Sequence, residues 1–188
     1  MKNTSLLLVI LFATVTSNAQ GVFKNKVNTA LEKVVQDYPS HFTNIKGEQL
    51  SSRQGAAEYK SNIVIPGALS TSITQQEASQ HSNITWQSVL FTSSEFGQAR
   101  TQFEELFNQI KNTVIRAPGE KAVIVNGMYI DPSADKNFTA VQFDLLPAAG
   151  LMQKLNIDLL LENTGSQWQI LLTVTDKERK DGGAIVVK

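Results

Sequence analysis

Residues 92–116 read TSSEFGQARTQFEELFNQIKNTVIR and contain the clearest amphipathic pattern in the chain. At about 100° per residue, seven of its apolar side chains fall within an arc of roughly 100°, the width of a stripe that faces a protein core. Thr92 and Glu95 have the spacing of a capping box, with Ser93 and Ser94 as alternative N-caps. We therefore predict a core-facing helix over 92–116. The stripe consists of Phe96, Ala99, Phe103, Leu106, Phe107, Ile110 and Val114.

A second amphipathic stretch lies upstream, from Gly21 to Tyr38. Its apolar residues recur at spacings of three and four, and Pro39 is expected to end the helix. Lys24, Lys26 and Lys33 lie away from the apolar face. This pattern predicts a helix laid on a sheet.

Between the two helices the pattern favours strands. Apolar residues alternate over 59–65 and again over 69–73, and Pro66-Gly67 separates the two runs as a bulge or turn. Residues 84–91 form another predicted strand. We expect Gly47 to mark a turn, Gln49–Gln54 a surface loop, and Gln75–Asn83 a hairpin loop.

The strongest β signals follow residue 116. Ala122–Val125 is a continuous apolar run, which is typical of a strand covered on both faces. Alternation over 138–145 predicts a further strand. Residues 155–161 and 168–174 alternate on either side of Asn163-Thr164-Gly165-Ser166, a hairpin pattern. Beyond them, 177–181 is a charged exit, and 184–187 is an edge strand or a frayed end.

These elements predict an α+β fold: two helices packed on one face of a twisted, mainly antiparallel sheet of about six strands, in the order α-β-β-α-β-β-β-β. The length of 188 residues suits one domain with a substantial core. Helix-then-strands occurs twice, but the two halves share no matching residues.

The first nineteen residues have the parts of a secretory signal peptide. Lys2 is the positive n-region, Leu6–Val15 the short apolar segment, and Ser17 and Ala19 the small residues of a cleavage site. We predict cleavage after Ala19, which leaves a single globular domain over 20–188. The apolar run is too short for a comfortable membrane span, so we expect a soluble, exported protein.

The composition of the chain limits the classes of binding partner that we expect. Apolar residues make up 41% of the chain and charged ones 18%, with a formal net charge of zero. Such a balance favours neither nucleic acid nor an anionic membrane. There is no cysteine, which excludes disulfides, thiolate metal sites and a cysteine nucleophile. For an exported protein this indicates the periplasm of a Gram-negative bacterium or the medium outside.

The usual catalytic motifs are missing from the sequence. His41 and His81 are the two histidines, both in polar stretches, and neither belongs to an HExxH pattern. No glycine-rich phosphate loop and no GxSxG elbow occurs. We interpret both histidines as surface residues and predict no catalytic, cofactor-binding or metal-binding residue and no cofactor.

Three further groups of residues have alternative interpretations. The segment 131–137 places Asp131, Ser133, Asp135 and Asn137 at calcium-loop spacing, but Lys136 replaces the required glycine and Gln142 the bidentate Glu. We favour an Asp-Pro turn between two strands. Glu104 and Glu105 are expected on a solvated helix face. Trp86 and Trp168 could line a ligand pocket, but core packing is the simpler prediction.

Three features of the sequence carry a resemblance: the signal peptide ending in Ser-Asn-Ala-Gln, the segment 42–47 (FTNIKG) and Pro66-Gly67. In these features the chain is similar to small uncharacterised exported proteins of Bacteroidetes. The resemblance implies an exported α+β domain and brings no activity with it.

Three classes of function are compatible with these patterns. The first is a non-enzymatic module that binds a small ligand or an envelope protein. The second is a structural or self-assembling envelope protein that associates through a sheet edge. The third is a hydrolase that uses carboxylates dispersed in the sequence. An apolar pocket of a few hundred Å³ would favour the first class.

Overall fold

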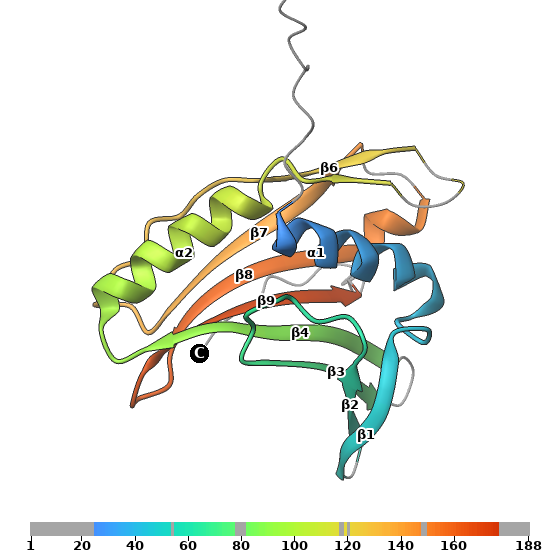
Figure 1. Cartoon of the computed structure of the whole chain (residues 1–188), viewed down its shortest axis with the longest axis horizontal. Coiled ribbons are helices and arrows are strands. Elements are labelled where there is room, and N and C mark those ends of the chain that lie inside the picture. Colours follow the sequence, from blue (N-terminus) through green and yellow to red (C-terminus); the bar gives the residue numbers. More distant parts are fainter. Residues whose placement is uncertain are drawn as a thin grey trace, which may run out of the picture.

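The computed structural model describes residues 25–53, 55–77, 82–116, 119, 121–147 and 150–176 (Figure 1). In chain order the elements are α1 (Lys26–Asp37), the 3₁₀ helix η1 (Tyr38–Ser40), β1 (Lys46–Arg53), β2 (Ala56–Ser61), β3 (Ser70–Glu77), β4 (Ser82–Ser93), α2 (Phe96–Ile110), β5 (Val114–Ile115), β6 (Val123–Gly127), β7 (Phe138–Leu146), the 3₁₀ helix η2 (Gly150–Lys154), β8 (Leu155–Asn163) and β9 (Trp168–Asp176).

The strands form one antiparallel sheet of nine, in the order β1-β2-β3-β4-β9-β8-β7-β6-β5. Strands β1 to β4 follow α1 as a meander, and β6 to β9 form a second meander after α2 and the short β5. The two meanders meet where β4 pairs with β9, which places Trp86 opposite Val174. A helix followed by an antiparallel meander therefore occurs twice in this chain.

Both helices lie on the same side of the sheet (Figure 1). Helix α2 contacts β4, β8 and β9, and α1 contacts α2 and β5. Aromatic rings join the two layers: the centroid of Phe96 lies 4.9 Å from that of Trp168, and Phe107 lies 5.7 Å from Phe143. The core is built between these helices and one face of the sheet.

The predicted C-terminal hairpin is confirmed as β8 and β9. Buried and half-buried residues alternate along β8, as expected for a strand with one face on the core. At the turn, the Asn163 side-chain oxygen accepts a hydrogen bond from the Gly165 backbone N–H at 2.8 Å, and Gly165 has a φ of 90°. Trp86 and Trp168 are both buried, which confirms their predicted place in the core.

The predicted fold class is wrong. The described part of the chain is mainly β, with nine strands where about six were expected, and four strands separate the helices where two were predicted. The residue pattern does not reveal β1 or β5. Strand β5 has two residues, too few to show any alternation.

Residues 49–53, predicted as surface loop, belong to β1. Most of the side chains of β1 are exposed, because the strand lies at the edge of the sheet. Polar residues are therefore acceptable on both of its faces, and the alternating pattern is lost. Gly47, predicted as a turn, also lies in β1. A Cβ there would come within 3.0 Å of the Lys60 carbonyl oxygen, so glycine permits the close approach of β2.

The predicted helix over 92–116 is shorter at both ends. Thr92 belongs to β4, and the N-cap Glu95 makes no side-chain capping bond, so the predicted capping box is wrong. The Ser93 hydroxyl instead accepts from the Glu95 N–H at 3.0 Å. At the other end Asn112 has a φ of 66°, a left-handed conformation that asparagine tolerates, and the chain turns into β5. Val114 therefore lies in a strand.

The run Ala122–Val125, predicted to be covered on both faces, contributes to β6 beside the edge strand β5. Ile124 is 45% exposed, and its cross-strand neighbour Leu146 is 46% exposed. One face of this strand is open, and a continuous apolar run does not distinguish the two situations. The predicted signal peptide, residues 20–24 and the tail 177–188 lie outside the described residues.

Candidate functional site

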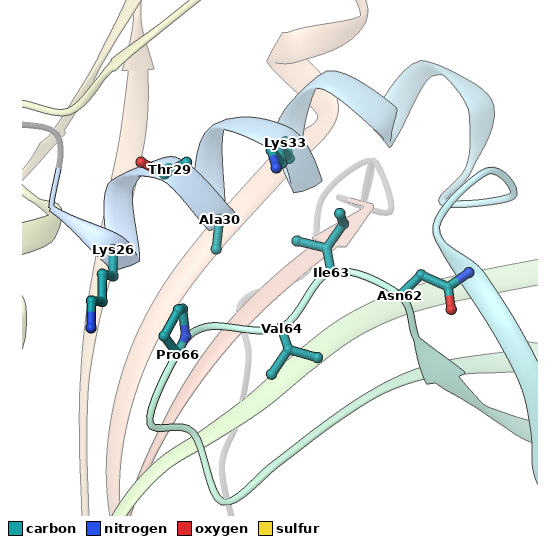
Figure 2. A pocket seen from close by; sticks show the side chains of 8 residues that line it. All are labelled: Lys26, Thr29, Ala30, Lys33, Asn62, Ile63, Val64 and Pro66. Atoms are coloured by element: carbon teal, nitrogen blue, oxygen red, sulfur yellow. The ribbon is translucent and has the colours of Figure 1, made fainter.

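An open cavity of about 300 Å³ lies between α1 and the segment that joins β2 to β3. Figure 2 shows Ala30 pointing from α1 toward this segment, which carries Ile63 and Pro66. Lys26 and Lys33 lie toward the two ends of the helical wall. We call this cavity the α1 pocket; it is lined by Lys26, Thr29, Ala30, Lys33, Asn62, Ile63, Val64 and Pro66.

The helical wall is fixed by its N-cap. Asn25 accepts a hydrogen bond from the Asn28 N–H at 2.7 Å, as an N-cap side chain does. The Asn25 amide also donates to the Gln109 carbonyl of α2 at 3.3 Å. The Thr29 hydroxyl donates to the Asn25 carbonyl at 3.2 Å. One residue thus starts α1 and ties it to α2, which holds the lining residues of the first two turns in place.

The opposite wall is organised around Ser61, at the end of β2. Its hydroxyl oxygen accepts from the buried Trp86 indole N–H at 3.0 Å and from the Ile63 N–H at 3.1 Å. The same hydroxyl donates to the Ile63 carbonyl at 2.7 Å. The Asn62 N–H donates to the Ile45 carbonyl at 2.7 Å. These bonds fix the backbone that presents Ile63 to the pocket.

The predicted break at Pro66-Gly67 is a turn in this wall. The Ala68 N–H donates to the Ile65 carbonyl at 2.9 Å, and Gly67 has a φ of 94°, which favours glycine. The Leu69 N–H then donates to the Val89 carbonyl at 2.8 Å, which returns the chain to the sheet. The segment is therefore anchored at both ends.

The charged side chains of α1 differ in their exposure to solvent. Glu32 and Asp37 are buried, and the Asp37 carboxylate accepts hydrogen bonds from the Asn44 N–H at 3.2 Å and from its side-chain amide at 2.7 Å. Lys26 and Lys33 are exposed at the pocket, and neither forms an ion pair with any other described residue. The lining contains no carboxylate and no histidine. The pocket accordingly combines an apolar floor with positive charge.

A smaller hollow of about 120 Å³ lies at the β1–β2 hairpin. Its lining is more polar and includes Arg53, Tyr59 and Gln75. The volume is well below that of ordinary small-ligand sites, which begin at about 300 Å³. The α1 pocket is therefore the better candidate for a binding site.

Another polar cluster joins α2 to the β6–β7 connection. Two guanidinium nitrogens of Arg100 donate to the two carboxylate oxygens of Asp131, each at 2.8 Å. Asp131 raises the pKa of Arg100 above its ordinary value. The Tyr129 hydroxyl oxygen is buried without a hydrogen bond of normal geometry, and its ring packs 5.1 Å from Phe107. Burial, and next the negative charge of Asp131, raise the pKa of Tyr129.

The segment 131–137 joins β6 to β7, as the interpretation of these residues as a turn predicts. The Lys136 N–H donates to the Ser133 carbonyl at 3.1 Å, which closes the turn. The carboxylate of Asp131, position 1 of the alternative calcium loop, is bound by Arg100. Within the described ranges, no group of three or more acidic or histidine side chains is arranged to hold a metal ion.

The two histidines have different outcomes. His41 is exposed, which confirms its predicted surface position. It follows η1 with a φ of 50°, and its ring packs edge-on against that of Tyr38, with 6.4 Å between the ring centroids. His81 lies outside the described residues. Glu104 and Glu105 are exposed on α2, which confirms their predicted place on the solvated face.

Sequence reasoning did not identify the residues of the α1 pocket. It assigned Lys26 and Lys33 to the polar face of a helix and Pro66 to a break between strands, and each assignment is correct locally. The available signal was two lysines seven positions apart, which share one helix face. Nothing in the sequence indicates that the segment after β2 crosses that face.

No helix in the described part of the chain has the length and hydropathy of a membrane span. Comparison of the chain with protein-family models, with curated proteins and with solved structures gave no match.

Proposed function

We propose that this protein is an exported, non-enzymatic binding module that holds a small, partly apolar ligand in the α1 pocket. The observation that carries the proposal is the pocket itself. Its volume of about 300 Å³ lies at the lower end of the range of small-ligand sites, and apolar side chains line its centre. A compact ligand of few atoms suits such a site.

The construction of the walls supports a binding role. Hydrogen bonds from Asn25 and Ser61 hold the two sides of the pocket, so little ordering is required when a ligand enters. A preorganised site loses less conformational entropy on binding. The lining offers no histidine and no carboxylate, and so presents no pair of groups for general acid–base hydrolysis.

The test uses 1-aminonaphthalene, a small neutral apolar dye whose fluorescence shifts to shorter wavelength in an apolar site. We expect saturable binding to the natural protein and chemical-shift changes at the amides of Ala30, Ile63 and Val64. An Ala30→Leu variant places extra carbons in the pocket and should weaken binding about tenfold or more, by occupying the volume that the dye needs.

Leu69→Ala is the matched control. Leu69 is an exposed apolar residue on the same segment but is not part of the lining, so its loss should leave the affinity for the dye unchanged. Thermal melts of both variants establish that they are folded. Equal dye affinity in natural and Ala30→Leu protein, or shifts confined to other regions, would refute the proposed function.

A further inference from the structure

We infer that the ligand of the α1 pocket carries an anionic group, such as a carboxylate, which Lys26 and Lys33 bind. This inference rests on the proposed function and adds the chemical class of the ligand. The two lysines are seven positions apart, so they lie two helical turns apart on one face, about 10 Å along the axis. The pocket lies between them, and both side chains are long enough to lean over it.

Among the described residues, no carboxylate pairs directly with this positive charge. Neither lysine forms an ion pair there, and the lining has no acidic residue. Both carboxylates of α1 are buried, and that of Asp37, one turn after Lys33, accepts its hydrogen bonds from Asn44. A bound anion would supply the missing negative charge.

The position of Lys26 within the helix points the same way. Lys26 is the first residue of α1, and the first turn contains no acidic residue. The N-terminal end of a helix has a partial positive charge, so helix stability alone favours Asp or Glu there and disfavours a cation. A lysine at this position is unfavourable for the helix by itself but favourable for a helix that holds an anion in the adjacent pocket.

The apolar lining indicates the polarity and size of the remainder of the ligand. Ala30, Ile63 and Pro66 would contact an aliphatic or aromatic body, while the charged group faces the lysines. At about 30 Å³ for each water-sized group, a cavity of about 300 Å³ holds roughly ten non-hydrogen atoms. A monocarboxylate of medium chain length has this size and polarity.

The test compares octanoate with octanamide, which have the same number of non-hydrogen atoms but differ in charge. Affinities are measured by calorimetry at low salt, and amide shifts at Ala30 and Ile63 establish that binding occurs in the pocket. We expect octanoate to bind at least about fivefold more tightly. Lys26→Gln and Lys33→Gln should each weaken octanoate binding about three- to fivefold, the size expected of solvent-exposed charge pairs.

Lys121→Gln is the control for net charge, because Lys121 is exposed and lies outside the lining. It should change neither affinity, and about 0.5 M salt should reduce the advantage of octanoate. Equal binding of the two compounds, unaffected by the lysine variants, would overturn the anionic ligand class but leave the proposed function standing. Failure of both compounds to shift the pocket amides would overturn both proposals.

Discussion

At the scale of single residues, Gly127 in β6 is packed too closely to accept a side chain without rearrangement. A Cβ built there would lie 2.6 Å from a ring carbon of Phe143 and 3.1 Å from the Gln142 carbonyl oxygen. Because a buried ring and a backbone oxygen are both this close, Gly127→Ala should destabilise the fold by roughly 1–3 kcal/mol. Urea denaturation measures the difference.

Gly97 provides the opposite case for the same substitution. It lies in the first turn of α2, and a Cβ there would meet nothing within 4 Å. Alanine favours the helix over glycine, so Gly97→Ala should raise stability by about 0.5–1 kcal/mol. A gain in stability for Gly127→Ala as well would contradict the packing described for β6, and a loss for Gly97→Ala would contradict the open space at α2.

Ser61 connects the core to the α1 pocket. Its hydroxyl oxygen accepts a hydrogen bond from the indole N–H of Trp86, a side chain with no exposed surface. Ser61→Ala would leave that buried donor unpaired and should cost roughly 1–3 kcal/mol. The backbone at Ile63 would also lose its anchor, so the affinity of the pocket for 1-aminonaphthalene should fall. Ser51→Ala on the exposed strand β1 should change neither quantity.

Tyr129 makes the stability of the protein depend on pH in the alkaline range. Its pKa is raised in the folded state from an ordinary value of 10.0, so the unfolded chain releases this proton first. The contribution of Tyr129 to the free energy of unfolding is therefore constant below about pH 10. It falls as the pH rises from there through the folded-state pKa. Tyr129→Phe should weaken that fall and cost little at pH 8, because the buried hydroxyl has no hydrogen bond of normal geometry to lose. Denaturation curves at pH 8 and 11 test this; parallel losses in both proteins would show that other groups are responsible.

At the scale of elements, α2 contributes its phenylalanines to the core. Phe103 has no exposed surface and Leu106 is buried, whereas Glu105 faces solvent. Phe103→Ala or Leu106→Ala should each lower stability by roughly 2–5 kcal/mol through lost contacts and the cavity left behind. Glu105→Ala should have little effect, and melting temperatures that coincide for all three variants would exclude this role of α2.

The elements that could be predicted from the sequence are those that bury one face and expose the other. Phe103 and Leu106 recur at helical spacing, and apolar and polar residues alternate along β8 and β9. Each pattern is regular because one face of the element packs on the core. Strand β1 has no buried face to impose a pattern, and the end of α2 depends on the left-handed Asn112. Edges and chain reversals are set by neighbouring strands, and such information is not local.

At the scale of the whole molecule, the pairing of β4 with β9 decides the architecture. It joins two meanders that lie far apart in the sequence, as when Trp86 meets Val174, and no local pattern indicates that partnership. The same reason hides the candidate site. Lys33 and Pro66 belong to different elements, and the pocket exists because α1 lies against the connection between β2 and β3. Their chemistry is visible in the sequence, but their proximity is a property of the fold.

The two sheet edges bear on the alternative that the protein assembles with copies of itself. One edge is β5, with two residues. The other is β1, whose pairing with β2 is irregular between Lys46 and Gln49 and between Gln49 and Ser51. Short edges and irregular strands are the usual protection against edge-to-edge pairing. We therefore expect a monomer whose elution volume is the same over a hundredfold range of concentration, of about 2–200 µM.

Leu50 makes this expectation sharper, because it is the exposed large apolar residue of β1. A Leu50→Lys variant adds charge to the edge and should elute as the natural protein does at every concentration. If the natural protein instead elutes earlier as its concentration rises, and Leu50→Lys abolishes that shift, then β1 pairs with a second copy in spite of its irregularities. That result would favour a self-assembling role over a module that binds its ligand as a monomer.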